Sequence, residues 1–290
     1  MSQFLQLLFS GLTVGATYAL SALGFSLIYN ASGVINFAQG EFIMLGGMVA
    51  AVLAAAGVSL PLAILAAVLV VTLVGLLIEK LAIEPARNAD ITSIIIITIG
   101  VAMIVRGAVE VTLGKGSHAL AHFSGDKPIA IGGATLLPQS LWVMAVTAIV
   151  VAALAVFFGR TRTGKGILAT AHNRLAAQLV GVDVKKVLLA SFGLSAALGA
   201  VGGILITPIA TTSYDAGLML GLKGFVAATF GGLGSGVGAV AGGVLLGLIE
   251  TMTAGYVSSA YKDAVPFVLV LVVLVVRPRG LFGLGSTDRV

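Results

Sequence analysis

The chain contains no cysteine, a single tryptophan and very little charge. The absence of cysteine excludes disulfide bridges, iron–sulfur clusters and thiolate metal sites. Its 16 lysines and arginines and 11 acids amount to 9% of 290 residues, against about 25% in an average soluble domain. So few charged side chains cannot form the polar surface that a soluble globule of this size needs. The composition therefore excludes a soluble enzyme, a disordered chain and a nucleic-acid-binding domain.

The residues that are abundant are apolar, since 59% of the chain is hydrophobic, and 39 residues are glycine. Nine apolar segments follow one another, at about 5–29, 35–56, 60–81, 92–113, 137–158, 184–209, 218–231, 238–256 and 263–276. The segment 218–231 is too short to cross ~30 Å of hydrocarbon as a straight helix, so we expect a half-span or a broken helix there. We therefore predict an all-α polytopic membrane protein with eight or nine apolar segments, in one transmembrane domain that covers residues 1–290.

Basic residues in short loops predict the orientation of the chain in the membrane. Residues 160–186 hold six lysines and arginines and only one acid, which is typical of a cytoplasmic loop. Alternation of the segments then places the tail, with Arg277, Arg279 and Arg289, in the cytoplasm. With nine crossings the N-terminus lies outside, whereas with eight crossings the side of the N-terminus stays open.

The same basic loop predicts one amphipathic helix that ends near Gly181, a residue suited to a C-cap. Its apolar positions recur at spacings of three and four: Leu168, Ala171, Leu175, Leu179 and Val182. Such a helix either lies on lipid headgroups or docks into a soluble partner protein. Its face is rich in alanine and has no aromatic anchor, which favours close packing against a protein.

No group of residues suggests catalysis or a bound cofactor. Gly164 and Lys165 nearly complete a phosphate-binding loop, but Gly166 stands where serine or threonine would bind magnesium. His118 and His122 are four residues apart, with no acidic residue nearby to complete a metal site. We predict no catalytic residue, no metal and no cofactor, and therefore a chain that is not an enzyme.

Polar residues open the second apolar segment, where Asn36, Gln39 and Glu41 follow one another closely. A charge inside a bilayer costs about 2.5–3.5 kcal/mol on insertion scales, so it usually faces a cavity or a partner. These three residues are therefore candidates to line a pathway through the membrane. An ordinary interfacial position is the alternative.

Other charges lie inside later apolar segments. Arg106 and Glu110 are four residues apart near the outer end of the fourth segment, which predicts a structural ion pair between them. Lys223 lies in the seventh segment and Glu250 in the eighth. For each of the last two, a place in a cavity and a place in a packed interface both remain open.

The glycine pattern predicts close packing between helices and one interruption of a helix. In lipid, helices associate through close backbone contact, so glycines four residues apart, such as Gly243 and Gly247, indicate packing faces. The run Gly231–Gly238 is dense enough to break a helix. Because non-helical backbone at membrane depth must be buried in protein or line a wet cavity, Gly231 and Gly234 are further candidates for the pathway.

Four sequence blocks, in the right order over most of the chain, resemble those of branched-chain amino acid ABC transporter permeases. They are Gly11-x-x-x-Gly-Ala-x-Tyr18-Ala-Leu-x-Ala-Leu-Gly24 with Gly33-Val-Ile-Asn36-Phe-Ala-Gln-Gly40-Glu41; Thr163-Gly-Lys-Gly166 with Ala171-x-Asn173-x-x-Ala176-x-x-x-x-Gly181-Val182; Phe225 with Gly231-Gly-Leu-Gly-Ser235; and Arg277-Pro278-Arg-Gly280-Leu-Phe-Gly283. One position departs from the pattern, because Gln39 replaces the usual histidine. Glutamine does not titrate, so we expect no proton transfer there.

The resemblance implies a permease subunit of an ATP-driven importer in a bacterial inner membrane, with branched-chain or other hydrophobic amino acids as substrates. Such a subunit works with a second permease, two cytoplasmic ATPase subunits and a periplasmic substrate-binding protein, and the ATPase subunits hydrolyse ATP. By position, the residues that contact the ATPase would be Gly166, Ala171, Asn173, Ala176 and Gly181.

Two other functions remain open at this point. One is a permease of the same superfamily for another small polar solute, such as urea, an amide or a sugar. The other is an ion-coupled secondary transporter, which would use interrupted helices and charges near the middle of the membrane.

Overall fold

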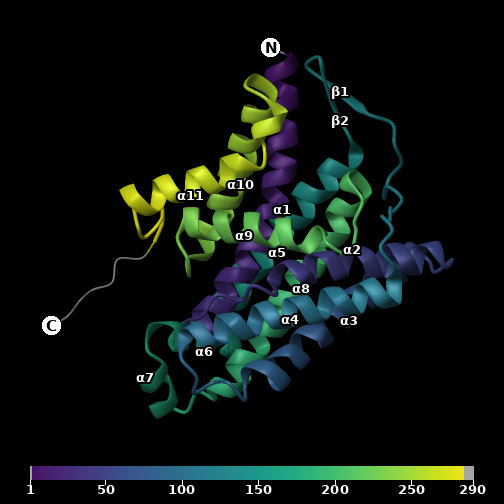
Figure 1. The fold of residues 1–290 in the computed structure, drawn as a ribbon. Helices are drawn as coiled ribbons and strands as arrows, with labels where there is room; N and C mark the ends of the chain where they lie inside the picture. Colours follow the sequence, from purple (N-terminus) through teal and green to yellow (C-terminus); the bar gives the residue numbers. More distant parts are fainter. Residues whose placement is uncertain (1, 284–290) are drawn as a thin grey trace.

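The computed structural model describes residues 2–283, and most of them are helical (Figure 1). Arg289, counted above in the basic tail, lies outside the described residues. Among the described residues, six helices are long and apolar enough to cross a membrane: α1 (Ser2–Ser32), α3 (Leu60–Ile78) with its continuation as the π-helix η1 (Glu79–Ile83), α4 (Ile91–Leu113), α5 (Pro138–Arg160), α8 (Val184–Ala210) and α10 (Gly236–Tyr256). Three apolar helices are shorter: α2 (Gln39–Ala55), α9 (Ala216–Gly231) and α11 (Ala264–Val276). The predicted all-α class is thus confirmed for this part of the chain.

Helix α1 forms the centre of the bundle, and α3, α4 and α5 lie at its periphery (Figure 1). In the most apolar window of α1, 89% of the residues are buried, compared with 28% in α3 and 17% in α4 and α5. α1 packs against α8, α9 and α10, and nothing in residues 2–283 covers the apolar outer surfaces of α3, α4 and α5. These outer surfaces are available to lipid or to another subunit.

Glycine allows α1 and α10 to approach backbone to backbone, as the sequence predicts. A Cβ atom at Gly247 would collide with the backbone of Gly15, and one at Gly243 would collide with the backbone of Ala19. Contact of this kind is the main way in which helices gain packing energy in lipid.

Helix α2 begins at Gln39, four residues later than the sequence predicts. The side chain of Asn36 accepts a hydrogen bond from the backbone N–H of Ala38 at 3.1 Å, and Gly33 adopts a φ of +73°. Asparagine competes in this way with helical hydrogen bonding of the backbone, so residues 33–38 form a non-helical connection and Glu41 lies in the first turn of the helix.

The basic loop contains two helices, α6 (Arg162–His172) and α7 (Arg174–Leu179), where a single helix was predicted. Asn173 separates them because it adopts an extended conformation, and its side chain accepts the N–H of Ala176 at 2.9 Å as an N-cap. The predicted C-cap is confirmed: Gly181 has a φ of +88°, and its N–H and that of Val182 satisfy carbonyls in the last turn of α7.

A short antiparallel hairpin, β1 (Ile129–Ile131) with β2 (Ala134–Leu136), lies beside the start of α1. The N–H of Thr135 donates to Gln6 of α1 at 2.7 Å. The 3-10 helix η2 (Ser259–Tyr261) follows α10. In Figure 1 the hairpin lies at the top beside the N-terminus, whereas α6 and α7 lie near the opposite end of α1.

Candidate transport and coupling sites

Gln39, at the start of α2, is completely buried between α1 and α8. Its amide oxygen lies 2.5 Å from the Ser195 hydroxyl, which also lies 2.9 Å from the carbonyl oxygen of Gly24. Its amide nitrogen donates to the carbonyl oxygen of Ser195 at 3.2 Å. Gly24 leaves room for the Gln39 amide, because a Cβ at position 24 would collide with it. Gln39 thus forms a polar junction between α1, α2 and α8.

Glu41, two residues further along α2, forms a buried ion pair with Arg106 of α4. Glu41 is 1% exposed, and its Oε1 lies 2.5 Å from Arg106 Nη2. The predicted pair of Arg106 with Glu110 is therefore wrong, and Glu110 instead pairs with Lys115 at 2.7 Å. Arg106 pairs with Glu41 because a buried carboxylate has lost its hydration and is costly without a cation, whereas the partly exposed carboxylate of Glu110 is still hydrated.

A pocket of about 300 Å³ adjoins this ion pair, between α1, α2, α4 and α9. Its other lining residues are apolar: Phe25, Phe37, Ile99, Ala102, Met103, Leu218, Gly221 and Leu222. Glu41 Oε2 and Arg106 Nε are buried and have no hydrogen-bond partner among the described residues. The pocket thus combines apolar walls with an ion pair that has unused donor and acceptor capacity.

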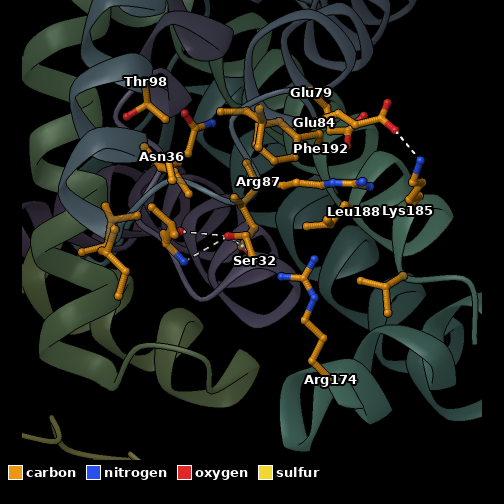
Figure 2. Close-up of a pocket in the computed structure, with 18 of the residues that line it drawn as sticks. Ser32, Asn36, Glu79, Glu84, Arg87, Thr98, Arg174, Lys185, Leu188 and Phe192 are labelled. Carbon is orange, nitrogen blue, oxygen red and sulfur yellow. Dashed lines mark hydrogen bonds and ion pairs between the residues drawn. The ribbon is translucent and has the colours of Figure 1, made fainter. Parts of the chain in front are cut away.

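A second cavity, of about 450 Å³, lies near the end of α1 that faces α7 (Figure 2). Asn36 lies at one end of it, and Arg87 and Arg174 extend toward its middle. Lys185 of α8 pairs with Glu84 at 3.1 Å on its rim. The structure therefore brings one predicted pathway residue and the predicted coupling helix to the walls of a single cavity.

Asp183, in the wall of the same cavity, fixes the start of α8. The backbone N–H groups of Lys185 and Lys186 donate to its carboxylate at 3.1 and 3.3 Å. The hydrogen bond from the Lys186 backbone, with help from the Lys186 ammonium group, lowers the pKa of Asp183 below its usual value. The carboxylate is thus kept charged at the positive end of the helix dipole.

The predicted coupling residues divide between a buried and an exposed group. Gly166 and the neighbouring Ile167 are buried, and Ile167 packs among Ala31, Val184 and Leu188 from the ends of α1 and α8. The exposed group is Ala171, Asn173, Ala176 and Gly181. On α7, Leu175 is 69% and Leu179 80% exposed, so nothing in the described chain covers the apolar side of that helix.

Gly231 and Gly234, the remaining pathway candidates, belong to a tight connection between α9 and α10. α9 ends at Gly231, as the glycine run predicts, and α10 begins at Gly236. The carbonyl oxygen of Gly234 accepts from Asn30 Nδ2 at 2.9 Å, close to the end of α1. The N–H of Phe282 donates to the carbonyl oxygen of Gly231, so the C-terminal block packs on this connection.

The model of the family described as "Branched-chain amino acid transport system / permease component" matches residues 7–274. The chain belongs to this family. Its membership, together with the apolar helices, makes the chain a multi-pass membrane protein with a transport role, not an enzyme.

Relatives of this permease cover nearly its whole length. It is 33% identical over 303 residues to the high-affinity branched-chain amino acid transport system permease protein LivH of Escherichia coli K12, covering 99% of this chain and 98% of the relative. The corresponding protein BraD of Pseudomonas aeruginosa is 33% identical over 301 residues, with the same coverage. The ribose import permease protein RbsC of Escherichia coli K12 is 26% identical, covering 93% of this chain and 84% of the relative.

A solved structure, PsaBC from Streptococcus pneumoniae in complex with Fab, contains a chain with a similar fold. The similarity has a TM-score of 0.50 and covers 95% of this permease and 92% of that chain. At 13% sequence identity, it supports a shared helical arrangement and nothing more.

Two charges in the bundle of this permease form a network that the sequence does not reveal. Lys223 Nζ lies 2.9 Å from Glu250 Oε1 and 2.6 Å from Asp263 Oδ1, and the Tyr18 hydroxyl donates to Glu250 Oε2 at 2.8 Å. The Lys223 side chain is 6% exposed and that of Glu250 is fully buried. One sequence feature does indicate this pair: adjacent apolar segments carry one charge of each sign, and such charges usually pair.

Proposed function

We propose that this chain is the transmembrane permease subunit of an ATP-driven ABC importer in a bacterial inner membrane. The proposed substrates are branched-chain or other hydrophobic amino acids, which enter the cytoplasm. The family match over residues 7–274 carries this proposal, and the relatives named as branched-chain amino acid permeases support it. Residues 1–290 act as one transmembrane domain, together with a second permease, two cytoplasmic ATPase subunits and a periplasmic substrate-binding protein.

In this proposal all nine apolar helices pass through the membrane, with the N-terminus outside and the C-terminus in the cytoplasm. α1 and α10 run antiparallel, because Leu7 lies against Gly255 at one end and Asn30 binds Gly234 at the other. This supports nine crossings, since the first and the eighth of nine consecutive crossings run in opposite directions. The basic residues around α6 and α7 favour the cytoplasm for the second end.

Reporter fusions test this orientation directly. We expect a reporter that is active only in the cytoplasm to work after Asn88 and after Asn173, and to fail after Asp126. Activity after Asp126, or an external Asn173, would contradict the proposed orientation.

We propose that α6 and α7 connect ATP hydrolysis to the transport path. The exposed apolar side of α7 supplies a contact surface for an ATPase subunit, while buried Ile167 attaches α6 to the ends of α1 and α8. Closure of the ATPase pair would then move α1 and α8 and open or close a path between this chain and the second permease. Asn36, Gln39, Glu41, Gly231 and Gly234 are the proposed residues of that path or its immediate support.

The coupling proposal predicts the effect of Ala176→Glu on α7. Ala176 is exposed, so the variant should fold, but a carboxylate in the ATPase contact would be buried without a partner, which costs about 2–5 kcal/mol. We expect uptake by the assembled transporter to fall by about tenfold or more, together with the amount of ATPase that copurifies.

The matched control is Ala130→Glu, which adds the same charge to the exposed hairpin at the other end of the bundle. This variant should retain copurification and uptake. Normal uptake and normal ATPase binding in Ala176→Glu would rule out α7 as the coupling contact.

The substrate class is tested by purifying the transporter with its substrate-binding protein and identifying the ligand that the binding protein holds. We expect leucine, isoleucine, valine or another hydrophobic amino acid. A bound sugar would instead favour the function suggested by the name of the more distant ribose permease relative.

A further inference from the structure

We propose that the 300 Å³ pocket between α1, α2, α4 and α9 is a substrate site that binds aliphatic amino acids as zwitterions. Glu41 pairs with the ammonium group of the amino acid, and Arg106 pairs with its carboxylate. This proposal rests on the proposed import function, and adds the residues that recognise the substrate within the membrane.

The first argument is the incomplete bonding of the ion pair. Glu41 is 1% exposed, and within residues 2–283 only its Oε1 has a partner, Arg106 Nη2. Its Oε2 lies close to Gly217 of α9 and, like Arg106 Nε, is buried with no hydrogen-bond partner among the described residues. A buried charged group that lacks hydrogen bonds is costly, whereas a guanidinium group offers five donors and a carboxylate several acceptor positions. An ammonium group and a carboxylate are the ligand groups that would use this spare capacity once both side chains turn toward the pocket.

The second argument is charge balance. The pair of Glu41 and Arg106 carries no net charge, so a cation or an anion bound beside it would leave one excess charge in a low-dielectric region. A zwitterion adds one charge of each sign, separated by a single carbon atom. The ammonium and carboxylate groups of one amino acid therefore complete the site without adding net charge.

The third argument is the shape and chemistry of the walls. Phe25 and Phe37 both pack against the ring of Phe225, at centroid distances of 5.9 and 5.8 Å, which holds one wall in place. Met103 and Leu218 lie on the exposed side and are 67% and 54% exposed. A volume of about 300 Å³ lies at the small end of the range for ligand pockets, and the apolar walls fit an aliphatic side chain.

The position of the pocket fits a path between two subunits. Residues of α4 and α9 line it at the surface of the bundle, and α4 is among the helices least covered by the rest of the chain. A second permease packed on this surface would close the exposed side of the pocket and exclude lipid from the ion pair.

The test uses the complete transporter in proteoliposomes, with L-leucine supplied by its binding protein. We expect Arg106→Gln and Glu41→Gln each to reduce ATP-driven leucine uptake by about tenfold or more. The matched control is Glu110→Gln on the same helix as Arg106, which removes a partly exposed carboxylate that pairs with exposed Lys115. Its uptake should stay within about twofold of the unmodified transporter.

Because loss of the ion pair can impair folding, a second variant keeps the pair and fills the pocket. Leu218→Trp enlarges an exposed wall residue, and we expect a similar loss of leucine uptake, with normal copurification of the ATPase subunits. Retained uptake in this variant would overturn the proposal, because a filled substrate site should not transport.

A binding measurement without the binding protein separates recognition from folding. We expect L-leucine to raise the unfolding temperature of the purified transporter, since a ligand of the folded state stabilises it. Leucinamide lacks the carboxylate and isocaproate lacks the ammonium group, so neither should have this effect. Equal shifts with all three compounds, or a full response to leucine in Arg106→Gln, would overturn the zwitterion site.

The result for the unmodified transporter distinguishes the two proposals. If it imports leucine and the variants of Glu41, Arg106 and Leu218 do so equally well, the site is wrong and the import function stands. If the unmodified transporter imports neither leucine, isoleucine nor valine, the proposed function fails, and the site fails with it.

Discussion

Replacement of Lys223 by methionine is expected to lower the free energy of unfolding of the permease by about 3–5 kcal/mol. The variant would leave the carboxylate of Glu250 completely buried, with the hydroxyl of Tyr18 as its nearest remaining donor. Lys262 Nζ lies 3.8 Å from Glu250 and can compensate only in part. Because proteins are typically stable by only about 5–15 kcal/mol, unfolding in detergent, followed by circular dichroism, should show a large shift.

Two further variants test whether loss of the Lys223–Glu250 ion pair causes the lower free energy of unfolding. The double variant Lys223→Met with Glu250→Gln should recover part of the stability, because no uncompensated charge remains buried. Lys185→Met removes an exposed partner of Glu84 and should change the free energy of unfolding by less than about 1 kcal/mol. Equal effects of Lys223→Met and Lys185→Met would contradict the assigned role of the buried network.

Substitution of leucine for Gly247 is expected to disrupt the contact between α1 and α10. Even the first carbon of the new side chain would occupy the position of the Gly15 backbone, and neither helix backbone can move without moving its neighbours. Overpacking of this kind costs about 1–3 kcal/mol and sometimes more. We expect a lower unfolding temperature and less folded protein in the membrane, measured by fluorescence-detected size-exclusion chromatography.

The matched control is Gly107→Leu on α4, where a Cβ would meet no atom within 4 Å. Leucine favours helix over glycine by about 0.5–1 kcal/mol, so this variant should be unchanged or slightly more stable. If Gly247→Leu behaved like Gly107→Leu, the close approach of α1 and α10 would not be a main source of stability.

The boundaries of the apolar helices follow well from the sequence, because membrane insertion depends mainly on long stretches without charge. The helix predicted over 92–113 is found at Ile91–Leu113, and the one predicted over 263–276 is found at Ala264–Val276. The two corrections are local. Asn36 delays the start of α2 and Asn173 divides the basic loop into two helices, in both cases because an asparagine side chain binds a backbone N–H that a continuous helix would use.

The charge partners could not be predicted from the sequence, since they depend on tertiary contacts. A spacing of four residues favoured Glu110 as the partner of Arg106, but the true partner, Glu41, lies 65 positions away and is far more buried. Lys223 and Glu250 are both charges in apolar segments, yet nothing in the sequence shows that they face one another. Glu41 was identified as a pathway candidate because a lone acid in an apolar segment already demands a partner.

For the proposed coupling region, α6 and α7, the sequence predicts helical structure but not its details. The basic residues and the spacing of apolar side chains located it, and Gly181 adopts the left-handed conformation expected of a helix end. The sequence could not show that Gly166 is buried against α8 while Ala176 is exposed, because that division depends on how α6 packs on the bundle.

The central claim, that this chain is a permease of an ATP-driven amino acid importer, is tested most directly by uptake of radiolabelled leucine. The measurement uses proteoliposomes that contain the complete transporter and its leucine-loaded binding protein, with and without ATP on the ATPase side. The claim predicts uptake that requires both ATP and the binding protein and that persists when ion gradients are collapsed. Uptake driven by an ion gradient without ATP, or no uptake of any branched-chain amino acid, would contradict it.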